Sequence, residues 1–282
     1  MGNTVHTITN ESIEEFIIWL RNEDRSEGTI QKYKRDITRL MSCLSGRPLT
    51  KERINEWKEK LISEEYNPVT VNSMIAAVNT YCRFAGLDIV TRFLKIQRRL
   101  YREDSRELSQ KEYEKLIETA ERTGNHKMAL LMETIAATGI RVSEVKYITV
   151  EAVKDRKTQI SLKRKIRDIM IPGKLCRKLL KFAEKNKIAA GEIFVTGSGK
   201  SISRKQIWAS MKAICRKAGV AETKVFPHNL RHLFARVYYR VYKDVAKLAD
   251  LLGHSSIETT RIYLISTGEE HARQLEKLRL VR

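Results

Sequence analysis

Apolar residues recur every three or four positions through the first ninety residues, which is the spacing of one buried helix face. The pattern predicts four helices, at 10–24, 27–44, 50–64 and 68–85. Ile13, Phe16 and Leu20 show the spacing most clearly, and Asn67 before Pro68 is typical of an N-cap followed by a proline in the first turn. We therefore expect a small helical domain over residues 1–96. Its aromatic residues at helix spacing, such as Trp57 and Tyr81, are interpreted as core residues.

The pattern changes after this domain. Residues 97–106 are highly charged and lose periodicity, which indicates a basic linker that could follow a duplex backbone. Ser109 and Glu112 then form a capping-box pattern that predicts the start of a new helix. Another apolar helix is expected near 126–138, with a break at Gly139. The second domain is expected to span residues 107–282.

A two-residue period replaces the helical one over residues 158–171. Ile160 and Leu162 alternate with polar neighbours, as do Ile169 and Ile171 after the polar turn around 164–165, which predicts a β-hairpin. Further helices are expected at 174–187, 203–217, 228–240, 243–252, 256–264 and 268–279, and Ser203 and Gln206 form a second capping-box pattern at the start of the helix 203–217. The predicted fold class is mainly α: an N-terminal helical domain, then a mostly helical domain with a small β-sheet.

Positive charge is concentrated in the second part of the chain. The 282 residues carry a formal net charge of +20, of which residues 1–100 contribute +3 and residues 101–282 contribute +17. Such an excess favours a polyanionic partner, because neutralising phosphates releases condensed counterions. Nucleic acid is the partner that the composition favours.

The cysteines and the N-terminus point to the compartment. Cys43, Cys82, Cys176 and Cys215 are widely spaced, with no metal-ligand pattern, as in proteins of a reducing compartment. No signal peptide precedes the first helix, and no stretch reaches the ~20 apolar residues of a membrane span. We expect a cytoplasmic protein with no membrane partner.

Several chemically capable residues follow one another in the second domain. They are Arg141 in TGIRVSE, Lys163 in the hairpin, His228 and Arg231 in HNLR, His254 in LGHSS, and Tyr263. Gly253 is expected to end a helix and to leave the ring of His254 exposed. Arginine presents paired, permanently charged donors that suit phosphate oxygens. A tyrosine with a pKa near ~10 needs nearby cations or a base before it attacks. The set predicts a cationic pocket around a phosphodiester, with a tyrosine hydroxyl as nucleophile.

Two supporting assignments depend on spacing. Glu144 lies three residues after Arg141 and could buttress that arginine or a histidine. Lys163 lies near the predicted hairpin tip and could protonate a departing 5′-oxygen, but Lys165 could do so as well.

The motifs TGIRVSE, HNLRH and LGHSSIETTRIY, with the hairpin lysine and the two-domain layout, resemble the tyrosine recombinase (phage integrase) family. The resemblance implies a SAM-like core-binding domain and a catalytic domain that clamp double-stranded DNA. It implies that Arg141, Lys163, His228, Arg231 and His254 activate the phosphate, and that Tyr263 forms a 3′-phosphotyrosine. It further implies four protomers on two DNA sites, and no metal or nucleotide cofactor.

Other interpretations remain open at this point. The chain starts with the core-binding domain, so we expect a simple recombinase that lacks a separate arm-binding domain. Integration or excision of a mobile element is the main expectation, and Xer-like chromosome dimer resolution is the alternative. A non-catalytic DNA-binding relative and a topoisomerase of the type IB class, which uses the same tyrosine chemistry alone, are the remaining hypotheses.

Overall fold

The chain forms two compact units, Met1–Arg98 and Arg99–Arg282, each of which is described by itself. The computed structural model describes residues 6–96, 107–162, 165–254 and 256–261, together with 273 and 275–278. The expected linker at 97–106 and the expected helix at 268–279 therefore lie outside the described residues, apart from the few positions just given.

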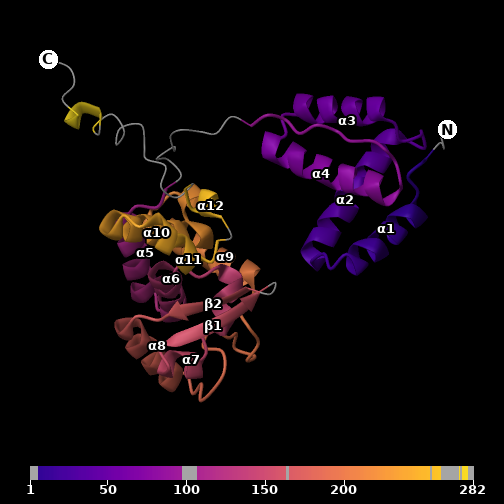
Figure 1. Ribbon diagram of the computed structural model, residues 1–282. Helices are drawn as coiled ribbons and strands as arrows, with labels where there is room; N and C mark the ends of the chain where they lie inside the picture. The colour runs from indigo at the N-terminus through magenta and orange to yellow at the C-terminus, as the bar shows by residue number, and fades with distance from the viewer. Residues whose placement is uncertain are drawn as a thin grey trace. The chain divides into compact units, whose positions relative to one another are not determined.

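The first unit is the predicted bundle of four helices (Figure 1). They are α1 (Asn10–Asn22), α2 (Glu27–Leu44), α3 (Lys51–Ser63) and α4 (Pro68–Phe84), so each predicted boundary is within two residues of the observed one. Asn67 caps α4 as predicted, because its side chain accepts a hydrogen bond from the Val69 amide. Phe16, Trp57 and Tyr81 are buried in the core, which confirms the structural interpretation of the aromatic residues.

Two asparagines of α4 fix the extended segment that follows the bundle. The Asn79 side chain bonds both the N–H and the C=O of Thr91, at 2.9 and 3.0 Å. The Asn72 side chain does the same for Leu94, at 2.7 and 2.9 Å. Each side-chain amide satisfies the backbone N–H and C=O of one residue, as a neighbouring strand would do in a sheet. The segment that follows α4 is therefore held along a defined path.

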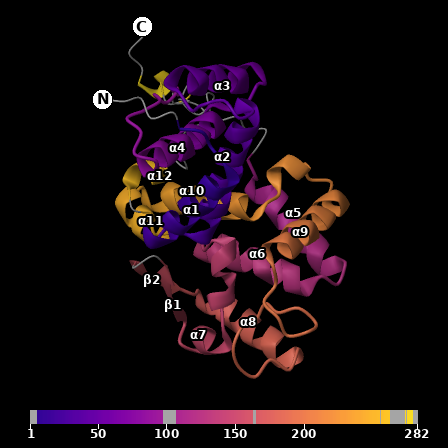
Figure 2. The same ribbon diagram turned by 90° about the vertical axis from the view of Figure 1, so that its right-hand side faces the viewer.

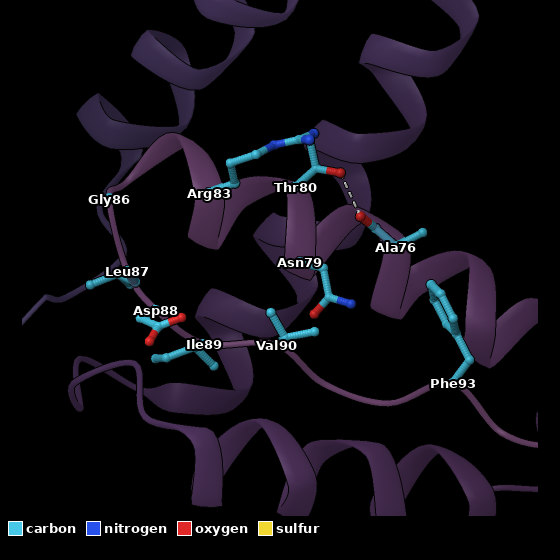
Figure 3. A pocket seen from close by; sticks show the side chains of 10 residues that line it. All are labelled: Ala76, Asn79, Thr80, Arg83, Gly86, Leu87, Asp88, Ile89, Val90 and Phe93. Carbon is cyan, nitrogen blue, oxygen red and sulfur yellow. Dashed lines mark hydrogen bonds between the residues drawn. The ribbon is translucent and has the colours of Figure 1, made fainter.

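A hollow lies between α4 and the segment that follows it (Figure 3). Its ionisable members are Arg83 and Asp88, and Thr80 bonds the Ala76 carbonyl at 2.7 Å. The residues that line it are Ala76, Asn79, Thr80, Arg83, Gly86, Leu87, Asp88, Ile89, Val90 and Phe93. This hollow does not contain the groups that phosphodiester chemistry needs.

The second unit is mostly helical with one small sheet, as predicted (Figures 1 and 2). Its elements are α5 (Gln110–Arg122), α6 (His126–Thr138), η2 (Val142–Tyr147), α7 (Val150–Lys154), β1 (Lys157–Leu162), β2 (Lys165–Met170), α8 (Gly173–Lys185), α9 (Arg204–Ala218), η3 (Glu222–Lys224), α10 (Pro227–Tyr242), α11 (Val245–Leu252) and α12 (Ile257–Arg261). The two 3₁₀ helices, η2 and η3, and the five-residue α7 were not predicted, since such short elements show no apolar repeat.

The caps predicted in this unit are present. Ser109 and Glu112 form the capping box of α5, and Ser203 and Gln206 form that of α9. Gly139 ends α6 in the left-handed conformation, with φ of 66°. The helix boundaries therefore follow from local chemistry that the sequence displays.

The β-hairpin pairs β1 with β2 in antiparallel register, from Lys157 opposite Met170 to Leu162 opposite Lys165. Ile160 and Ile169 are buried against the helical core, while Ile166 on the other face is exposed. Because side chains alternate along a strand, Arg167 lies on the same core-facing side of β2 as Ile169. Among the described residues, no helix is both long and apolar enough to cross a membrane.

Replacing Gly139 with alanine tests the turn that leads into η2. A Cβ at this position would lie 2.5 Å from Cδ1 of Phe234, on a backbone with positive φ. We expect Gly139→Ala to lower the free energy of unfolding by about 2–5 kcal/mol, from backbone strain and overpacking together. Gly124→Ala is the matched control: it also has positive φ, but nothing lies within 4 Å of its added Cβ. It should cost about 1–2 kcal/mol. Equal losses in urea denaturation would contradict the steric account.

Candidate active site

The candidate site lies where the turn after α6, the helix α10 and the end of α11 meet. Figures 1 and 2 both show α10 and α11 side by side, and β2 contacts α11. Arg141 comes from the first segment, Arg231 from the second and His254 from the third. The structure thus brings together three residues that are far apart in the sequence.

Arg141 and Glu144 form a closed arrangement at the start of η2. The Arg141 amide donates to Oε2 of Glu144 at 2.7 Å, and its Nη1 donates to Oε1 at 2.8 Å. Nη2 of Arg141 also reaches the Gly253 carbonyl at 3.4 Å. The Glu144 side chain is 1% exposed and that of Arg141 is 42% exposed. The carboxylate therefore holds the arginine from inside while its guanidinium stays accessible.

Arg231 is buried, with only 2% of its surface exposed. Its Nη1 donates to the Gly139 carbonyl at 2.5 Å, and its Nη2 donates to the Leu252 carbonyl at 2.6 Å. Nη2 also lies 3.0 Å from Nε2 of His254. Arg231 therefore ties the end of α6 to the end of α11. This burial differs from the expectation that its paired donors are open to a phosphate.

The hydrogen bonds of His254 define the tautomer of its ring. Arginine can only donate, so Nε2 of His254 accepts from Arg231. Nδ1 then carries the proton and donates to Oγ1 of Thr260, 2.8 Å away. Gly253 ends α11 in the left-handed conformation, as predicted. The ring of His254 beside it is half-buried, so it is less exposed than expected.

The surroundings of His254 keep its imidazole neutral. Burial, as the largest cause, and the charges of Arg231, Arg141 and Arg167 together lower the pKa of His254 to about 4. A cation is disfavoured here because the ring is partly removed from water and faces three guanidinium groups. His254 is therefore a hydrogen-bonding group at neutral pH.

His228 lies in the first turn of α10 with its side chain exposed. Its ring is 4.4 Å from that of His232, in a T-shaped arrangement. His228 contributes to the lowered pKa of His254, so its charge acts on the same site. Arg231, three residues later, is buried, so the two side chains differ in their access to solvent.

Two of the predicted residues lie outside the described residues. They are Lys163, which falls between β1 and β2 in the sequence, and Tyr263, which follows α12 in the sequence. Lys165 begins β2, but its side chain is not among those described. Both roles therefore remain predictions from the sequence.

Sequence reasoning missed one residue of this site, Arg167. Its Nη2 donates to Oε2 of Glu144 at 2.6 Å, and its Nη1 donates to the Leu252 carbonyl. Burial lowers the pKa of Arg167 from its ordinary value. The signal was present in the strand pattern, because Arg167 has the same parity as the predicted core residues Ile169 and Ile171. A charged residue at a core-facing position needs a buried partner.

The charged groups of the candidate site suit an anion better than a metal ion. In the part of the chain that the structure describes, no group of three His, Cys, Asp or Glu side chains is placed to hold a metal ion. The cationic groups of the site, in contrast, suit an anionic ligand.

Comparisons with known proteins agree with this geometry. The phage integrase family model matches residues 106–270, and the phage integrase N-terminal SAM-like domain matches residues 13–87. The tyrosine recombinase XerA of Pyrococcus furiosus is 28% identical over 285 residues, covering 98% of this chain and 96% of the relative. The chain therefore belongs to the phage integrase family and is a site-specific tyrosine recombinase.

Two solved structures share the fold. One is a lambda integrase tetramer bound to a Holliday junction, with a TM-score of 0.74 and 19% identity, covering 93% of this chain and 78% of that one. The other is the Tn1549 transposon integrase in complex with transposon right-end DNA, with a TM-score of 0.70 and 14% identity, covering 96% and 99%. Both confirm the predicted combination of a helical N-terminal domain and a mostly helical catalytic domain.

The pKa of His254 leads to a pH dependence of stability. The imidazole of His254 has a pKa of about 4 in the folded protein and its ordinary pKa of 6.5 in the unfolded chain. Between pH 6.5 and pH 4 the unfolded state therefore binds more protons than the folded state. Lowering the pH through this window therefore favours unfolding. We expect the melting temperature of the wild type to fall between pH 6.5 and 4 more steeply than that of His254→Gln, which cannot take up that proton. Parallel curves would contradict the burial of a neutral His254.

Proposed function

We propose that this recombinase cleaves and rejoins DNA through a covalent intermediate on Tyr263. The Tyr263 oxygen forms a bond to phosphorus, and the bond from phosphorus to the 5′-oxygen breaks. The products are a 3′-phosphotyrosine and a free 5′-hydroxyl, and attack by a 5′-hydroxyl reverses the step. No bond energy is lost, so the strands can be exchanged and resealed without a nucleotide cofactor.

The observation that carries this proposal is the convergence of Arg141, Arg231 and His254 around the Gly253 turn. Fixed guanidinium groups stabilise the charge that develops on phosphate oxygens during the displacement. Arg141 is accessible enough to contact a phosphate directly. Arg231 would exchange one of its present acceptors for a phosphate oxygen when DNA enters.

The histidines have different roles in this proposal. His254 is neutral and anchored at Nδ1 by Thr260, so its Nε2 can accept the Tyr263 proton once Arg231 turns to a phosphate oxygen. His228 is exposed in the first turn of α10 and would contact the phosphate. Lys163 would protonate the leaving 5′-oxygen, with Lys165 as the alternative donor. Glu144 would hold Arg141 in place.

The rest of the chain would hold the DNA. We assign core binding to residues 1–96, tracking of the duplex backbone to the basic segment 97–106, and catalysis to residues 107–282. We further propose that the enzyme acts in the cytoplasm as a tetramer on two double-stranded DNA sites. The lambda integrase tetramer on a Holliday junction, which shares the fold, supports this assembly.

Integration or excision of a mobile element is the biological role that we propose first, and the likeness in fold to a transposon integrase supports it. Xer-like dimer resolution is the second candidate. It is favoured by the match to XerA over 98% of this chain and 96% of the relative. Both roles use the same chemistry, and the location of the cleaved site in the source genome separates them.

Tyr263→Phe tests the nucleophile. Protein is incubated in EDTA with nicked duplexes from its own genomic neighbourhood, denatured, and assayed for covalently attached DNA. We expect 3′-linked adducts with the wild type and none with Tyr263→Phe, which lacks the attacking oxygen. The DNA affinity of Tyr263→Phe should equal that of the wild type. Tyr242→Phe is the matched control, because Tyr242 is an exposed tyrosine of α10 outside the site. It should form adducts at the wild-type rate.

Each remaining hypothesis has its own signature, either in this experiment or in a parallel assay with supercoiled plasmid. DNA binding without adducts in the wild type would favour a non-catalytic relative. Adducts on any supercoiled plasmid, with relaxation by a monomer, would favour the topoisomerase. Adducts in Tyr263→Phe would place the nucleophile elsewhere.

A further inference from the structure

We propose that Arg167 is a positioning residue that holds Arg141 and the His254 turn in one arrangement and connects both to the hairpin that carries Lys163. This inference rests on the proposed function, since it concerns the same site. Arg167 does not belong to the set of residues that the sequence motifs pointed to.

The position of Arg167 in β2 directs its side chain inward. It pairs across the hairpin with Ile160, which is buried, and its own side chain is 10% exposed. Residues opposite each other in an antiparallel pair point to the same face of the sheet. A guanidinium removed from water in this way is costly unless acceptors replace the lost water.

Arg167 has two such acceptors, and each belongs to a different part of the site. Nη2 donates to Oε2 of Glu144 at 2.6 Å, the same oxygen that accepts from the Arg141 amide. Nη1 donates to the carbonyl of Leu252, the same oxygen that accepts from Nη2 of Arg231. One side chain of the hairpin thus shares an acceptor with each of the two arginines.

The turn before His254 also packs directly on Arg167. A Cβ added to Gly253 would lie 2.6 Å from Cδ of Arg167 and 3.0 Å from its Nη1. Gly253 therefore meets two requirements, a positive φ and the close approach of this side chain. The turn cannot shift toward the hairpin without displacing Arg167.

These contacts distinguish Arg167 from a phosphate ligand. Both terminal nitrogens already donate to protein acceptors, and little of the side chain reaches solvent. Arg167 therefore acts through Glu144 and Leu252. Lys163 precedes Arg167 by four residues in the sequence. A displacement of β2 would break both contacts, so the hairpin and the arginine site are ordered together.

The test compares Arg167→Met, Arg167→Lys and the wild type on a nicked duplex that traps the adduct. The duplex carries the site recovered with wild-type protein. The rate of adduct formation is measured at saturating protein, below the melting temperature of each variant, and the Kd for the duplex is measured separately. Arg177→Met is the matched control, because it removes an exposed arginine of α8 from the same unit.

We expect Arg167→Met to slow adduct formation by about 10–100-fold, as loss of a residue that orients catalytic groups does. Its Kd should change no more than that of Arg177→Met. Arg167→Lys keeps the charge and can reach one acceptor at a time, so its rate should lie between those of Arg167→Met and the wild type. This partial rescue at constant Kd would not arise from a general loss of structure. If Arg167→Met does not fold, the comparison of Arg167→Lys with the wild type tests the proposal, and we expect slower adduct formation at an unchanged Kd.

Two outcomes would overturn the inference alone. One is that Arg167→Met forms the adduct at the wild-type rate. The other is a loss confined to Kd and equal to that of Arg177→Met, which would make Arg167 one of many generic cations. A wild-type protein that forms no adduct on any duplex would instead refute the proposed function.

Discussion

The carboxylate of Glu144 is the group on which the candidate active site depends. Three guanidinium groups converge on the turn at Leu252 and Gly253. As a scale for their repulsion, two like charges ~4 Å apart repel by about 4 kcal/mol at an effective dielectric constant of ~20. Glu144 is almost fully buried and accepts hydrogen bonds from Arg141 and Arg167. It supplies the negative charge that lets these two arginines stay close before any phosphate arrives.

Backbone carbonyls balance the third arginine. The carbonyls of Gly139 and Leu252 accept hydrogen bonds from Nη1 and Nη2 of Arg231. Both carbonyls lie at helix ends, where the last C=O groups have no partner within the helix and carry partial negative charge. The glycines after α6 and α11 let the chain turn so that these carbonyls face the arginine. Helix termination and charge placement are therefore the same feature of this fold.

Much of this structure follows from local sequence signals. The helices of the first unit, the capping boxes at Ser109 and Ser203, and the hairpin have short-range causes and were predicted within a few residues. The candidate residues Arg141, Arg231 and His254 were found by motif, and the structure brings them together. The burial of Arg231 and the half-buried ring of His254 were not expected. They depend on which carbonyls and which neighbouring elements surround each side chain, and no spacing in the sequence gives that.

Arg167 shows how a site residue can be missed and how it could be found. It lies in no motif, but it is a charged residue on the strand face that also carries Ile169 and Ile171. Pattern reasoning applied to charges as well as to apolar residues would have identified it as buried. Its partners, Glu144 and the Leu252 carbonyl, come from segments 23 and 85 residues away, and only the tertiary structure pairs them.

The measurement that tests this account most directly is the rate of covalent adduct formation by Glu144→Gln. Glutamine has the same size, but it replaces one acceptor oxygen with a donor and removes the buried negative charge. The account predicts that adduct formation at saturating protein falls at least ~10-fold, while the Kd for DNA stays equal or becomes tighter because the protein loses a negative charge. A wild-type rate in Glu144→Gln, with DNA binding intact, would contradict the claim that this carboxylate organises the site.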